Sequence, residues 1–162
     1  DKRIIDGSRK AATMAHELMN RVNEAISFVK EKKIENVYFR HPAINTTPES
    51  GDVCLSMLIG STEYPSRHAV PRDIYVRIEF DVEKQRAELL RDTIVYNTMS
   101  DVLYETWASV LFEDYDRLEK SLEGFLIGEM RKRMTPQARI ALANSQPTNR
   151  RTACFSHLPD YC

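Results

Sequence analysis

The sequence predicts an α+β fold: an N-terminal helix, a small and mostly antiparallel sheet of three to four strands, then a long C-terminal helix and a short one. The helices are expected to pack on one face of the sheet. Three observations support this prediction. Apolar side chains recur at helical spacing in residues 8–33 and in residues 100–134, and they alternate with polar ones in residues 74–82. A chain of 162 residues then forms one domain, 1–146, followed by an arm, 147–162.

The first predicted helix, residues 8–33, carries one continuous apolar stripe. Three lysines, Lys30, Lys32 and Lys33, fall at its end, where positive charge suits the helix dipole. The stripe consists of Ala11, Ala15, Leu18, Val22, Ala25 and Val29.

The middle of the chain is predicted to form the sheet. Residues 37–40 read as a short strand and residues 41–52 as a loop that contains two prolines and a glycine. Residues 53–59 read as a buried strand, and residues 74–82 as a half-buried one. Residues 83–98 are ambiguous, because strong helix formers precede a stretch that prefers a strand. We favour a hairpin partner for 74–82 over a helix.

The long C-terminal helix is predicted over residues 100–134. Ser100 is a good N-cap, and Arg131, Lys132 and Arg133 lie in the last turn. Thr135 and Pro136 are typical of the start of a second, short helix. The stripe of the long helix contains Tyr104, Ala108, Leu111, Tyr115, Leu118, Leu122 and Phe125.

These periodicities together predict the core, because each stripe needs a buried side. The predicted core comprises Leu18, Val22, Val29, Val53, Leu55, Ile74, Val76, Ile78, Phe80, Leu111, Leu118 and Leu122.

The composition excludes several classes of protein. The net charge is −1 with 42% hydrophobic residues, so a domain-wide basic field for nucleic acid is absent. No apolar run is long enough to cross a membrane. Three widely spaced cysteines make no disulfide framework, which favours a cytoplasmic location. With five glycines and no phosphate-binding motif, we expect no cofactor.

One segment suggests thiol chemistry. In HPAINTTPESGDVCLSML, the matching residues are His41, Pro42, Ile44, Gly51, Val53, Cys54, Leu55, Ser56 and Leu58. This segment resembles the active-site stretch of ubiquitin-conjugating enzymes, although Ala43 replaces an Asn of the family. The resemblance implies that Cys54 is a thioester-forming nucleophile. The alternative is an inert Cys54 buried among apolar neighbours in a strand, which raises a thiol pKa.

The late part of the chain offers two further sites. Cys154, His157 and Cys162 have residue types that bind zinc, but no fourth strong ligand completes a site, so we expect no metal. A cluster of basic side chains could bind phosphates, which indicates a nucleic-acid-binding accessory protein as the alternative function. The cluster consists of Arg131, Lys132, Arg133, Arg139, Arg150 and Arg151.

The leading hypothesis is a non-enzymatic assembly or adaptor protein that self-associates or joins a larger complex, such as a virion. Tyr and Trp are favoured at interfaces, and aromatic side chains spread around more than one face of the predicted long helix. We expect Trp107 and Phe112 to face outward. The order helix, strand, hairpin, helix resembles that of small ring-forming virion neck and tail proteins. The expected interface residues are Tyr104, Trp107, Phe112, Tyr115, Phe155 and Tyr161.

Overall fold

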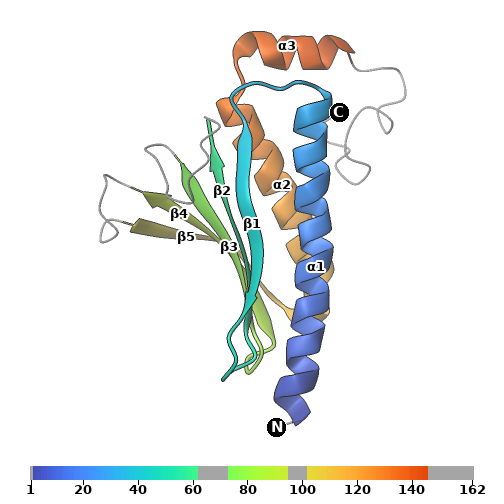
Figure 1. The fold of residues 1–162 in the computed structure, drawn as a ribbon, viewed down its shortest axis with the longest axis vertical. Coiled ribbons are helices and arrows are strands. Elements are labelled where there is room, and N and C mark those ends of the chain that lie inside the picture. Colours follow the sequence, from blue (N-terminus) through green and yellow to red (C-terminus); the bar gives the residue numbers. More distant parts are fainter. Residues whose placement is uncertain (1, 62–72, 95–101, 146–162) are drawn as a thin grey trace.

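The computed structural model describes residues 2–61, 73–94 and 102–145, without the side chains of residues 93–94, 102–104 and 141–145. It shows an α+β fold with one sheet and helices on one of its faces (Figure 1). The elements are α1 (Lys2–Glu31), β1 (Tyr38–Thr46), β2 (Val53–Gly60), β3 (Ile74–Asp81), β4 (Arg86–Ile94), β5 (Val102–Leu111), the 3-10 turn η2 (Phe112–Asp114), α2 (Tyr115–Arg133) and α3 (Pro136–Ser145).

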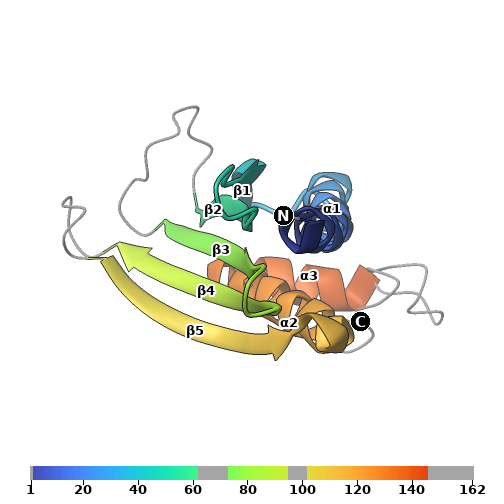
Figure 2. The same ribbon diagram turned by 90° about the horizontal axis from the view of Figure 1, so that it is seen from below.

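Within the described residues, five strands form an antiparallel meander in the order β1-β2-β3-β4-β5, so β1 and β5 are the two edges of this sheet. The sheet curves, and α1 packs on β1 and β2 while α2 packs on β4 and β5 (Figure 2). α1 and α2 also contact each other. Apolar side chains of both helices and the inward-facing side chains of the strands therefore share a single core.

Most of the predicted elements are confirmed. α1 carries the expected stripe and begins earlier than residue 8, and β2 and β3 match the two predicted strands. Residues 86–94 form the hairpin strand β4, not a helix. The side chain of Thr135 caps α3, because its hydroxyl accepts a hydrogen bond from the N–H of Ala138 at 3.1 Å.

The predicted loop 41–52 is partly wrong, because β1 continues through Pro42 to Thr46. Proline has no N–H to donate, but β1 is an edge strand and its register shifts between Arg40 and Ala43. The irregularity therefore accommodates Pro42, and residues 43–46 pair again with β2.

The predicted long helix is wrong over residues 102–114. Residues 102–111 form β5, the helix begins only at Tyr115, and the sheet has five strands in place of three to four. A register shift between Leu89 and Leu90 leaves Trp107 as an extra residue between Thr106 and Ala108. This bulge breaks the alternation of apolar and polar residues by which a strand is recognised in a sequence.

The predicted core is buried except at its boundary between β5 and α2. Leu111 is only half-buried, whereas its neighbour Phe112 is 3% exposed and packs against Phe80 with ring centroids 6.1 Å apart. Val110 of β5 is buried, so the alternation of the strand turns Leu111 outward and Phe112 inward again. The expectation that Phe112 faces outward is wrong.

Candidate functional site

Trp107 is an exposed aromatic side chain on the edge strand β5. It is 47% exposed, and its ring lies edge-on to that of Phe125 in α2, with centroids 5.2 Å apart and an interplanar angle of 79°. A T-shaped pair of this kind is a favourable aromatic geometry. One side of the indole therefore packs against the core, and the other side is exposed to solvent.

The other expected interface residues do not gather around Trp107. Phe112 is buried, and Tyr115 is half-buried with its hydroxyl 3.4 Å from a carboxylate oxygen of Glu119. Burial, and then the negative charge of Glu119, raises the pKa of Tyr115. The side chain of Tyr104 lies outside the described part of the chain, as do Phe155 and Tyr161.

A groove lies at the opposite edge of the sheet, between the C-terminal end of α1 and the first residues of β1. We call it the α1–β1 groove; its volume is about 730 Å³. Four aliphatic side chains and two aromatic ones line it, together with four basic or imidazole side chains, and none of these ten lining residues is acidic. The lining residues are Ile26, Val29, Lys30, Lys33, Ile34, Val37, Tyr38, Phe39, Arg40 and His41.

The groove forms where α1 ends in a left-handed cap. Lys33 has φ 52°, and the N–H of Ile34 donates to the carbonyl of Val29 at 3.0 Å while that of Lys33 donates to the carbonyl of Lys30 at 3.2 Å. These bonds form a Schellman motif, in which the left-handed position is usually Gly. His41 also has a positive φ, 51°. The groove thus holds two non-glycine residues in a disfavoured conformation.

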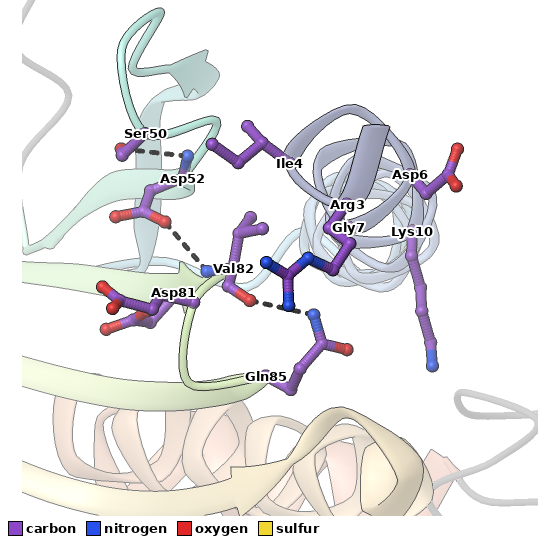
Figure 3. A pocket seen from close by; sticks show the side chains of 11 residues that line it. Arg3, Ile4, Asp6, Gly7, Lys10, Ser50, Asp52, Asp81, Val82 and Gln85 are labelled. Atoms are coloured by element: carbon purple, nitrogen blue, oxygen red, sulfur yellow. Dashed lines mark hydrogen bonds between the residues drawn. The ribbon is translucent and has the colours of Figure 1, made fainter. Parts of the chain in front are cut away.

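A second pocket, of about 790 Å³, lies at the other end of α1 (Figure 3). Ile4 points toward the turn that carries Asp52, whose carboxylate accepts the N–H of Val82 at 2.8 Å. Gln85 Nε2 donates to the carbonyl of the same Val82 at 2.9 Å. Basic and acidic side chains both line this pocket, so it favours neither an anionic nor a cationic ligand. Its hydrogen bonds stabilise the β1–β2 and β3–β4 turns.

Cys54 lies on the open face of the sheet, away from the helices. It alternates with the core residues Val53 and Leu55, pairs with Asn45 and Glu79, and is half-buried. Burial, and then the charge of Glu79, raises the pKa of its thiol. The raised pKa agrees with the inert alternative, but the predicted apolar surroundings are wrong.

The residues of the segment that resembles ubiquitin-conjugating enzymes do not gather around the Cys54 sulfur. The bulge at His41 and Pro42 lies between Arg40, which pairs with Leu58, and Ala43, which pairs with Ser56. Cys54 pairs with Asn45, further along the strand. A histidine and a nucleophile need hydrogen-bond reach to act together, and this register does not bring the two together.

The basic residues at the end of α2 are largely engaged within the protein. The buried carboxylate of Glu129 accepts hydrogen bonds from Arg133 at 2.6 Å, Arg91 at 2.9 Å and Lys132 at 3.3 Å. Arg139 donates to the backbone carbonyl of Arg131. Arg150 and Arg151 lie outside the described residues, as do the candidate zinc ligands Cys154, His157 and Cys162.

Metal and membrane sites receive no support within the described ranges. Among residues 2–61, 73–94 and 102–145, no three His, Cys, Asp or Glu side chains are grouped closely enough to hold a metal ion. In the same part of the chain, no helix has the length and apolar character that crossing a membrane requires.

Comparison of the sequence with protein-family models and with curated proteins, and of the fold with solved structures, gives no match. The resemblance of the Cys54 segment to ubiquitin-conjugating enzymes therefore rests on that short segment alone.

Proposed function

We propose that this protein is a non-enzymatic assembly or adaptor protein that binds another protein chain along the free edge of β5. The observation that carries the proposal is the exposure of Trp107 on that edge. An edge strand presents unpaired backbone N–H and C=O groups that a second chain can pair with. Tryptophan is enriched among the residues that contribute most to interfaces.

The packing of Trp107 favours binding over mere exposure. Because Phe125 already fixes the indole ring, little side-chain freedom remains to be lost when a partner covers it. Glu105, Thr106 and Ser109 flank it as exposed polar residues. A central aromatic side chain with a polar rim is the usual anatomy of a non-obligate interface.

The test compares Trp107→Ala and Thr106→Lys with the native chain. Thr106→Lys places a charge on the edge without disturbing the contact between Trp107 and Phe125, so it separates lost binding from lost packing. Ile5→Ala, at a 51% exposed position on α1, is the matched control for removing surface apolar area. The measurements are sedimentation velocity of the purified chains and capture of partners by the same chains immobilised.

We expect the native chain and Ile5→Ala to sediment above the monomer mass, or to capture the same defined partner, and the two β5 variants to lose that behaviour. An interface of standard size would bury about 1,600 Å². A chain ending at Gln146 shows whether the arm 147–162 contributes. A native chain that stays monomeric and captures nothing that Trp107→Ala fails to capture contradicts the proposal. Nucleic acid retained at low salt and released at high salt would favour the nucleic-acid alternative.

A further inference from the structure

We propose that the α1–β1 groove is a second binding site, which takes an extended peptide segment of a partner protein rich in Asp or Glu alternating with aliphatic residues. The groove lies at the β1 edge of the sheet and is separate from the β5 edge. The inference therefore does not depend on the proposed role of Trp107.

The charge of the groove selects an acidic occupant. Lys30 and Lys33 are exposed at its rim, and none of the described residues that line it is acidic. Arg40 is 6% exposed and forms a close ion pair with Asp73, so its charge is already balanced within the protein. The two lysines are thus the positive charges that the groove offers to a ligand.

The lining of the groove favours a ligand peptide that has apolar side chains between its acidic ones. Val29, Ile34 and Val37 are buried members of the core that reach the groove, and Ile26 and Phe39 pack against the same core at half-buried positions. A carboxylate-rich ligand without apolar side chains would leave the exposed parts of Ile26 and Phe39 in contact with water.

The geometry of β1 selects an extended conformation for the occupant. Residues 38–40 lie on the sheet edge and line the groove, so an added strand can pair with their backbone while alternate side chains turn inward. The bulge at Pro42 ends that pairing. A nucleic acid would satisfy the lysines but would leave the four aliphatic side chains of the lining without an apolar partner.

The backbone conformation of Lys33 adds a second argument. A cap of this geometry favours Gly, yet the position carries a lysine with φ 52° at the rim of the groove. Residues in disfavoured conformations gather at functional sites, where side-chain chemistry outweighs the cost in stability.

The experiment measures fluorescence anisotropy of a labelled peptide in which Glu and Val alternate over about ten residues, the upper end of usual strand lengths. Three competitors are compared with this peptide. The first has Lys in place of Glu, the second has Ser in place of Val, and the third is a single-stranded oligonucleotide of equal charge. The protein variants are Lys30→Glu, Lys33→Glu and Lys33→Gly. Lys120→Glu, at an exposed position of α2, matches the charge change away from the groove.

We expect the Glu/Val peptide to bind, and the combined reversal of Lys30 and Lys33 to weaken binding by about tenfold or more, which corresponds to about 1.4 kcal/mol. Lys120→Glu should leave the affinity unchanged. Lys33→Gly should weaken binding although it relaxes the cap, so unfolding cannot explain the loss. No binding of the peptide, equal binding of the Ser peptide, or tighter competition by the oligonucleotide would each overturn the proposal.

Discussion

At the scale of single residues, the buried carboxylate of Glu129 pairs with three cationic side chains. It is 1% exposed and bonds Arg91, Lys132 and Arg133, which joins β4 to α2 and its C-terminal turn. Burial opposes its ionisation, but the hydrogen bond and charge of Arg133, followed by those of Arg91, outweigh it and lower the pKa of Glu129. The sequence does not reveal this group, because a glutamate on a helix reads as a solvated one.

Replacing Glu129 tests this network. Glu129→Gln should lower the free energy of unfolding by about 3 kcal/mol near neutral pH, because it leaves partly buried arginines without their counter-charge. A lowered folded-state pKa contributes stability that is present above the ordinary value of 4.5 and is lost as the pH falls through the folded-state pKa. Urea unfolding of both chains at several pH values checks this. A difference that does not shrink in acid would contradict it.

At the scale of elements, the sequence predicts those whose periodicity is unbroken and fails where local backbone irregularity interrupts it. The stripe of α1 and the alternation of β3 are regular, and both predictions are confirmed. The bulge at Trp107 conceals β5, and the bulge beside Pro42 conceals the second half of β1. Both irregular strands are edges, where distortion costs a sheet least. These same edges carry the two candidate surfaces. The sequence indicated Trp107 as an interface residue but placed it on a helix, and it indicated no site at the α1–β1 groove.

The cap of α1 yields a prediction for this element. Lys33→Gly should raise the free energy of unfolding by about 0.5–1 kcal/mol, because Gly adopts the left-handed conformation without the steric cost that lysine bears. Thermal unfolding measures the change. Glu31→Gly, two residues earlier and still within α1, is the matched control. It should destabilise by about 1 kcal/mol or less, since Gly is unfavourable inside a helix. Equal effects of the two substitutions would show that the cap is not strained.

At the scale of the whole molecule, one core joins α1 and α2 to all five strands. Leu118 of α2 is 1% exposed within the cluster that also contains Leu18 of α1 and Ile78 of β3. Because these residues bury one another, the described elements should unfold together.

Leu118→Ala tests this cooperativity. It should lower the free energy of unfolding by about 2–5 kcal/mol, through lost burial and the cavity left behind. It should also leave a single transition that far-ultraviolet circular dichroism and tryptophan fluorescence report at the same denaturant concentration. Trp107 is the one tryptophan of the chain, so its fluorescence follows β5 and α2 while the dichroism also follows α1. Separated midpoints would show that α1 with β1 and β2 unfolds independently. An unchanged midpoint would show that Leu118 does not support the core.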